Sequence, residues 1–117
     1  MQGSEAHALA AADGFIRSGK WAEAVESLER AVELSPDAPR LRVALIEALR
    51  GANRISDAAA VARDALLRWP EDLSLRVESA AVQLDGSQVD AAIADLRFIL
   101  ARQADYFEAR FNLGLAL

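Results

Sequence analysis

Three arginines recur at equal spacing along the chain, because Arg42, Arg76 and Arg110 are each 34 residues apart. A guanidinium group pairs with a phosphate or a carboxylate through two parallel hydrogen bonds, so an aligned column of arginines could bind phosphates or acidic tails. The alternative, which we favour, is that each arginine lays its aliphatic stem over a seam between helices and keeps its charged head in water or on a nearby carboxylate. The sequence leaves the role of this column open.

Side chains suited to catalysis or metal binding are few. His7 is the only histidine and the chain has no cysteine, so neither a histidine-based or thiolate metal site nor a serine-histidine pair can be assembled. The carboxylates of Glu26, Glu29 and Glu33 follow one another at helical spacing, which is typical of a solvated helix face rather than of an acid-base pair. No glycine-rich phosphate loop is present. We expect no enzyme activity, no metal and no cofactor.

Composition limits the class of protein further. A chain of 117 residues with 53% hydrophobic residues can form one domain with its own core, so we expect a single domain over residues 1–117. The net charge of -5 disfavours nucleic acid, whose binding is mostly neutralisation of phosphates.

No apolar stretch reaches the roughly 18 residues of a membrane span, and the chain does not open on a signal segment. We expect a cytoplasmic location, and the bias toward alanine and arginine suggests a bacterial source.

The chain repeats itself with a fixed period. Segments 19–36, 53–70 and 87–104 each begin 34 residues after the one before. The same kinds of side chain recur at that interval in four columns: Trp21, Ile55 and Val89; Ala24, Ala58 and Ala92; Leu28, Ala62 and Leu96; and Ala31, Ala65 and Ile99. Such self-similarity indicates a repeat architecture.

Within each segment the apolar residues are three and four positions apart, as on the buried face of a helix. Further helical segments lie between them, over roughly 5–17, 39–51, 73–85 and 107–117. The sequence therefore predicts seven helices and no strands, with antiparallel neighbours because the connections are short.

Glycines and prolines mark the expected ends of these helices. We expect the chain to reverse at Gly19, Gly51 and Gly86, because glycine tolerates the left-handed conformation that ends many helices. Pro36 and Pro70 are expected to end the helices before them. Ser87 followed by Asp90 resembles a capping box.

A 34-residue helix-turn-helix unit with small, bulky and small positions in its second helix and a terminal proline resembles the tetratricopeptide repeat. The last nine residues, ARFNLGLAL, are similar to the first-helix phrase of that family, with Leu113 and Gly114 as its leucine-glycine pair. Arginine at the usual bulky position, and Ser79 and Gln83 at usually apolar positions, depart from the family pattern. The resemblance implies repeats over about 5–38, 39–72 and 73–106, then the first helix of a fourth over 107–117.

The resemblance also implies a fold and a binding surface. The fold is all-α, a right-handed superhelical α-solenoid of antiparallel helix pairs, whose concave wall of first helices holds a peptide or helix of a partner protein. The family register places the following residues in that partner-binding groove: Leu9, Asp13, Arg17, Arg40, Val43, Glu47, Arg50, Val77, Ala81, Leu84, Phe111 and Leu115. We therefore expect a non-enzymatic protein-protein interaction scaffold.

One subclass of the family clamps the terminal carboxylate of heat-shock chaperones with lysine and asparagine on its first helices. The matching places here provide no cation, since they hold Leu9, Asp13, Ala44, Ser74 and Glu78. We therefore do not expect this chain to bind chaperone tails.

Two other functions stay open. The helix over 107–117 has Phe111 and Leu115 on a side that nothing in the sequence covers, so this end could join copies of the chain into a homo-oligomer. Alternatively, the repeats could be the regulatory region of a larger enzyme or secretion component, and we expect a longer parent chain that continues beyond Leu117.

Overall fold

The computed structural model describes residues 2–103 and 107–116, and every regular element in these ranges is an α-helix. The seven helices are α1 (Gln2–Arg17), α2 (Trp21–Leu34), α3 (Pro39–Gly51), α4 (Ile55–Arg68), α5 (Leu73–Asp85), α6 (Val89–Arg102) and α7 (Phe107–Ala116). The all-α prediction is confirmed, and the expected helices are present within a few residues of their predicted ends. Leu117, the last residue of the expected fourth repeat, lies outside the described ranges.

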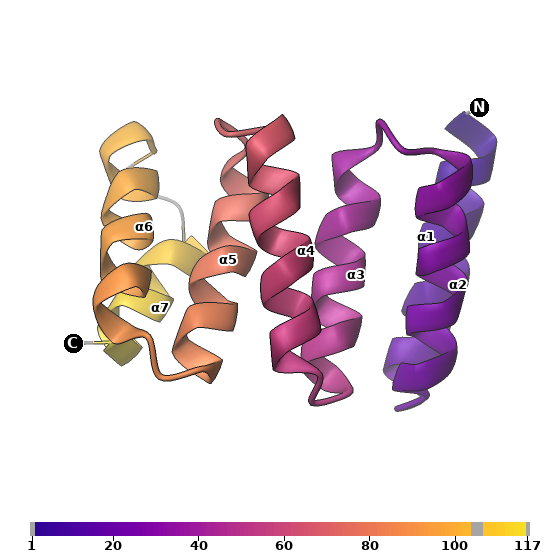
Figure 1. Ribbon diagram of the computed structural model, residues 1–117, viewed down its shortest axis with the longest axis horizontal. Coiled ribbons are helices and arrows are strands. Elements are labelled where there is room, and N and C mark those ends of the chain that lie inside the picture. The colour runs from indigo at the N-terminus through magenta and orange to yellow at the C-terminus, as the bar shows by residue number, and fades with distance from the viewer. Residues whose placement is uncertain (1, 104–106, 117) are drawn as a thin grey trace.

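The helices stand side by side as antiparallel pairs in one row, with the two ends of the chain at opposite ends of the row (Figure 1). The row measures 37 × 26 × 23 Å. The first helices of successive pairs contact one another, α1 with α3, α3 with α5 and α5 with α7. In the described ranges the second helices, α2, α4 and α6, contact only first helices. The first helices are thus the more closely packed layer, which makes their side the concave one.

The turns inside the helix pairs share one backbone geometry. A left-handed residue occurs at Gly19, Asn53 and Ser87, with φ of 74°, 60° and 64°, and these positions are spaced by the repeat period. The backbone amide of the next residue forms a hydrogen bond that ends the preceding helix. Its amide donates to the carbonyl five residues earlier, from Lys20 to Phe15 (2.8 Å), from Arg54 to Leu49 (2.8 Å) and from Gln88 to Gln83 (2.7 Å).

This geometry corrects two sequence predictions. Gly51 and Gly86 do not adopt the left-handed conformation, which belongs to the residue one or two places later. Ser87 does not cap α6 either, because a capping residue needs extended backbone and Ser87 is left-handed. The N-cap of α6 is Gln88, which makes no side-chain cap hydrogen bond. Pro36 and Pro70 do follow the ends of α2 and α4, at Leu34 and Arg68.

Two clusters of buried side chains form the core of the described residues. The larger one joins α1 to α4 with part of α5, and its fully buried members include Val25, Leu28, Leu41, Ile46 and Leu49. The smaller one consists of Val77, Ala80, Ala92, Leu96 and Ile99, from α5 and α6. The alanine column of Ala24, Ala58 and Ala92 is fully buried. Each pair is therefore stabilised by its neighbours, as expected for stacked repeats.

Helix α5 separates the two clusters and carries polar groups into the interior. Glu78 and Ser79 are both buried. Ser79 Oγ donates to Asp95 Oδ2 of α6 (3.3 Å), and Glu78 Oε1 lies 3.6 Å from Arg50 Nη1 of α3. The Ser79 contact lies within the third repeat, whereas the Glu78 contact joins the second and third repeats.

Candidate functional site

The arginine column takes a structural role at two of its three positions. Arg42 Nη1 donates to the carbonyl of Pro36 (3.1 Å). Arg76 repeats this contact one period later, where Nε and Nη2 donate to the carbonyl of Pro70 (3.1 and 3.0 Å). Arg76 Nη1 also donates to Asp95 Oδ1 (3.2 Å). These contacts agree with arginines that span helix seams rather than with a free phosphate-binding column.

Aromatic rings lie beside the guanidinium groups of these arginines. The guanidinium groups of Arg42 and Arg68 lie 5.6 and 4.6 Å from the ring centre of Trp69. Burial and the nearby charge of Arg68 lower the pKa of Arg42 below its ordinary value. Arg76 and Arg102 lie in the same way 4.1 and 3.5 Å from the ring centre of Phe98. Such cation–π contacts hold the outer edges of the helix pairs together.

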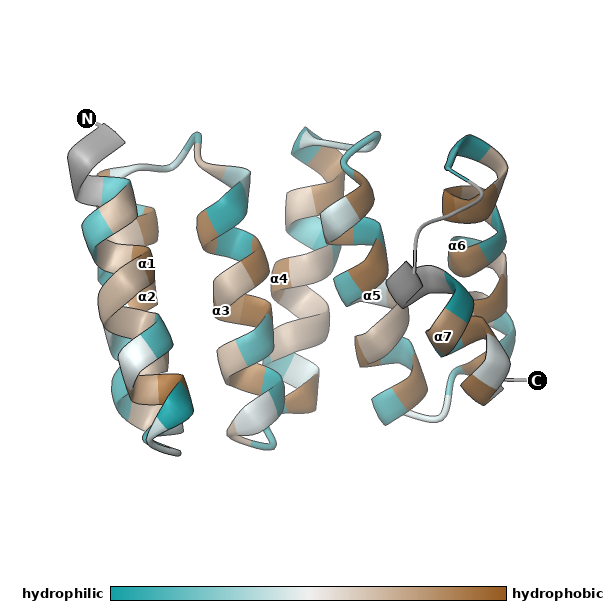
Figure 2. Ribbon diagram, turned by 180° about the vertical axis from the view of Figure 1, so that it is seen from behind, coloured by the Kyte–Doolittle hydropathy of each residue, from teal (hydrophilic) through white to brown (hydrophobic). Residues whose placement is uncertain are grey.

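The twelve predicted groove residues lie at three depths. Four are half-buried: Leu9, Val43, Arg50 and Leu84. Six are exposed: Asp13, Arg17, Arg40, Glu47, Phe111 and Leu115. Val77 and Ala81 are buried at 3% and 8% exposure, because α5 has first helices on both sides. Those two residues are too buried to contact a partner, whereas the other ten are accessible. On the same side, α7 shows several apolar segments (Figure 2).

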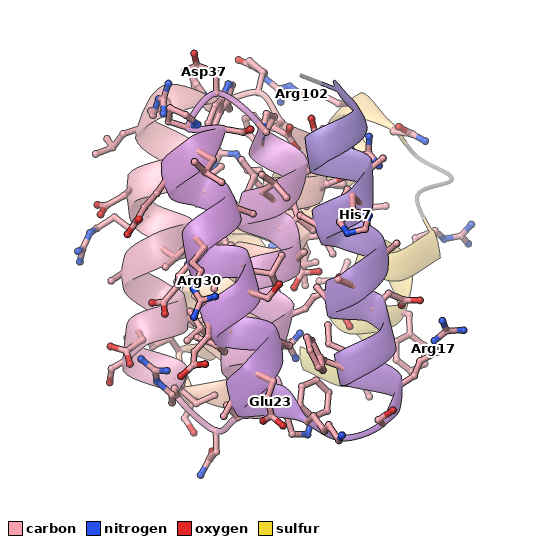
Figure 3. The ribbon with its side chains drawn as sticks, turned by 90° about the vertical axis from the view of Figure 1, so that its right-hand side faces the viewer. His7, Arg17, Glu23, Arg30, Asp37 and Arg102 are labelled. Atoms are coloured by element: carbon pink, nitrogen blue, oxygen red, sulfur yellow. The ribbon has the colours of Figure 1, made fainter. Side chains whose placement is uncertain are left out.

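Charges on this concave surface pair with each other. Arg17 Nη2 lies 3.1 Å from Asp13 Oδ2 on α1. Arg40 Nη1 lies 3.7 Å from Glu5 Oε1, and the Arg40 side chain is 72% exposed. Figure 3 shows Arg17 pointing away from α2, toward the side of the first helices. Arg17 and Arg40 are thus both largely exposed, each beside one carboxylate.

Arg50 is bound within the chain itself. Its Nε donates to Asp85 Oδ2 (2.7 Å), across from the second repeat to the third. Although burial by itself lowers the pKa of Arg50, the hydrogen bond and charge of Asp85 outweigh it and raise that pKa. Sequence reasoning did not single out Asp85 for this surface. The available signal was its position 35 residues after Arg50, at the same end of the next first helix.

Open hollows lie in the described surface at several places. The one beside Arg50 has a volume of about 520 Å³ and includes Trp21, Glu47 and Asp85. A second, of about 710 Å³, lies between α4 and α6 over α5. A third, of about 840 Å³, lies between α1 and α2. The described side chains contain no cluster of ligands that could hold a metal ion. None of the described helices is both long and apolar enough to cross a membrane.

Solved structures share this fold at low sequence identity. The second TPR domain of human RPAP3, in complex with the HSP70 peptide SGPTIEEVD, is 16% identical, with a TM-score of 0.82 over 93% of this chain and 91% of that one. The first TPR of Spaghetti (RPAP3), bound to the HSP90 peptide SRMEEVD, is 18% identical, with a TM-score of 0.82 over 93% and 89%. A tetratricopeptide repeat protein from Parabacteroides merdae is 20% identical, with a TM-score of 0.78 over 97% and 45%. At such identities the likeness shows the fold alone.

Sequence comparison identifies the family directly. No curated protein gives a significant match. Two models of the tetratricopeptide repeat match, one over residues 15–80 and the other over residues 77–117. The first alone spans more than half of the chain, and the two together reach from the end of α1 to the last residue. The chain therefore belongs to the tetratricopeptide repeat family.

Proposed function

We propose that this chain is a non-enzymatic scaffold that binds a peptide or helix of a partner protein on the concave side of its first helices. The observation that carries the proposal is the alternation of accessible apolar and charged side chains on that surface. Leu9, Val43 and Leu84 are half-buried, and Phe111 is 57% exposed. Exposed apolar residues on one wall, between charges, suit an amphipathic segment of a partner.

The charges of the surface restrict the partner further. Arg50 is already held by Asp85 and Glu78, and Arg17 lies 3.1 Å from Asp13. Arg40 lies farther from its partner Glu5, at 3.7 Å, so Arg40 is the groove cation most available for an acidic contact. The relatives that bind HSP70 and HSP90 peptides hold segments that end in Glu-Glu-Val-Asp. Such a tail would meet the exposed carboxylate of Asp13 here, and the buried Glu78 supplies no cation for it. We therefore expect a largely apolar partner segment with few acidic residues.

Three substitutions test the concave surface, each removing an accessible apolar side chain: Val43→Ala, Leu84→Ala and Phe111→Ala. Leu67→Ala is the matched control, because Leu67 is 79% exposed on α4, in the layer of second helices. We expect each groove variant to weaken a partner found by affinity capture by about 1 kcal/mol or more, as residues central to an interface do. The control should bind like the wild type. Isothermal titration calorimetry measures the affinities, and circular dichroism checks that the helices persist.

Two results would contradict this proposal. One is retention of full affinity in all three groove variants. The other is tight binding of the peptides SGPTIEEVD or SRMEEVD by the wild-type chain, since that would assign it to the acidic-tail class. Fluorescence anisotropy with both labelled peptides provides that second measurement.

Self-association is a second candidate function, favoured by the 57% and 68% exposure of Phe111 and Leu115 on α7. Exposed apolar surface on a terminal helix can be covered by another copy. Light scattering across a concentration series should then give a mass that rises with concentration, and Phe111→Ser with Leu115→Ser should hold the mass at that of one chain. A wild-type mass that stays constant would exclude this function.

A further inference from the structure

We propose that the end face of the row, formed by α1 and α2, is a second docking site, and that its occupant is a basic amphipathic helix of a partner protein. This end groove differs from the concave surface both in position and in charge. Figure 3 looks directly onto it, with His7 on α1 and with Glu23 and Arg30 on α2. The hollow of about 840 Å³ lies between these two helices.

Small and apolar side chains line the end groove. Its floor and walls include Ala8, Ala11 and Phe15 of α1 with Ser27 and Ala31 of α2. Leu34 stands at the rim and is 82% exposed. In the other two repeats the position of Leu34 is occupied by Arg68 and Arg102. The apolar rim is thus particular to the first repeat.

The repeat geometry of the chain shows that a helix fits such a face. In the second repeat, Leu41, Leu45 and Leu49 of α3 are buried at 0%, 5% and 1% exposure, and α2 packs against α3. One period earlier, this column of α1 holds His7, Ala11 and Phe15, which line the open groove. The groove on α1 is therefore equivalent to the surface of α3 on which α2 packs. It is hollow at Ala11, because the equivalent residue of α3 is the larger Leu45.

The charge of the end groove indicates which kind of helix would bind there. Residues 1–38 carry seven acidic and three basic side chains, which is most of the net charge of -5. Glu23 and Glu26 line the groove together with Glu5, which is paired with Arg40, and the one cation in the lining is Arg30. Within the part of the chain that the structure describes, Glu23 and Glu26 form no ion pair. An acidic rim around an apolar floor complements lysines that flank a stripe of large apolar side chains.

The occupant is thus defined by two requirements. Leucine or phenylalanine side chains at helical spacing would fill the hollow over Ala8 and Ala11, because alanine leaves room that larger residues take in α3. Lysine or arginine beside that stripe would meet Glu23 and Glu26. Since these carboxylates lie at the surface, their contribution should fall as the salt concentration rises.

A synthetic helix of 16 residues, the length of α1, is a suitable probe. It carries leucines on one face and lysines on the flanks, and its counterpart has glutamate in place of every lysine. Fluorescence anisotropy measures the binding of both peptides to the wild-type chain. We expect the lysine peptide to bind at least about tenfold more tightly than the glutamate peptide at low salt, and this preference to shrink at high salt.

Variants of the chain locate the site. Ala11→Arg places bulk and positive charge in the groove, and we expect it to weaken the lysine peptide by about tenfold or more. Glu23→Gln with Glu26→Gln should weaken it about three- to tenfold, as removal of two exposed ion pairs does. The matched control is Glu29→Gln with Glu33→Gln, which removes the same charge from the same helix at positions outside the groove lining. This control should stay within about twofold of the wild type.

Several outcomes would overturn the proposal. Equal binding of both peptides, or equal weakening by both glutamine pairs, would mean nonspecific attraction. Wild-type chain that dimerises without peptide, and becomes monomeric on Ala11→Arg, would make a second copy the occupant. A longer parent chain that no longer binds the peptide would make its own preceding segment the occupant. Val43→Ala should leave peptide binding unchanged, and this separates the end groove from the concave surface of the proposed function.

Discussion

At the scale of single residues, contact with an aromatic ring requires glycine at position 51. A Cβ atom on Gly51 would lie 2.2 Å from Cε3 of Trp21, while the backbone there does not have a positive φ. We predict that Gly51→Ala lowers the free energy of unfolding by about 1–3 kcal/mol, the usual cost of overpacking. Urea unfolding followed by far-UV circular dichroism measures this value.

Gly14→Ala is the control, because a Cβ on Gly14 meets no atom within 4 Å in the interior of α1. This change should raise the free energy of unfolding by about 0.5–1 kcal/mol, since alanine costs less backbone entropy in a helix. Equal stabilisation by both substitutions would show that the Trp21 ring does not cover Gly51. The sequence predicted a turn at Gly51 because glycine is conformationally free. No local pattern could reveal that the Trp21 ring of the preceding helix pair packs against Gly51.

At the scale of elements, hydrophobic periodicity predicted all seven helices, whereas the chemistry of their ends was predicted less well. The left-handed positions follow the period through Gly19, Asn53 and Ser87, and alignment of the three turns would have found them. A non-glycine residue in that conformation costs roughly 1–2 kcal/mol. We predict that Ser87→Gly raises the free energy of unfolding by about 1 kcal/mol, and Asn53→Gly by less because asparagine tolerates this conformation better.

Ser27→Gly serves as the comparison for the turn variants, since Ser27 lies in the middle of α2. There glycine should lower the free energy of unfolding by about 0.5 kcal/mol, the difference in helix propensity. Urea denaturation of both variants measures these changes in the free energy of unfolding. If Ser87→Gly destabilises the chain as Ser27→Gly does, the connection between α5 and α6 is not left-handed at Ser87.

At the scale of the whole molecule, the repeat register predicted the order and pairing of the helices because each pair contacts only its neighbours. It predicted the candidate site less completely. Val77 and Ala81 occupy groove positions in the register but are buried, since α5 lies between α3 and α7. Ser79 and Gln83, by contrast, replace the buried leucines Leu45 and Leu49 of the second repeat. Buried polar groups on α5 therefore lie beside the apolar contact of Leu75 and Val82 with α4.

Arg50 connects the second and third repeats at the surface, through Asp85 at 2.7 Å and the buried Glu78 at 3.6 Å. We predict that Arg50→Ala lowers the free energy of unfolding by about 2 kcal/mol, because hydrogen bonds to charged groups contribute roughly 1.5–3 kcal/mol. Hydrogen exchange measured by NMR should show α6 losing protection before α2 and α3. Arg17→Ala is the control, since Arg17 and its partner Asp13 are 76% and 61% exposed, and it should cost less than about 1 kcal/mol. Uniform loss of protection across all helices would mean that the two repeats unfold as one unit and that Arg50 does not hold them together.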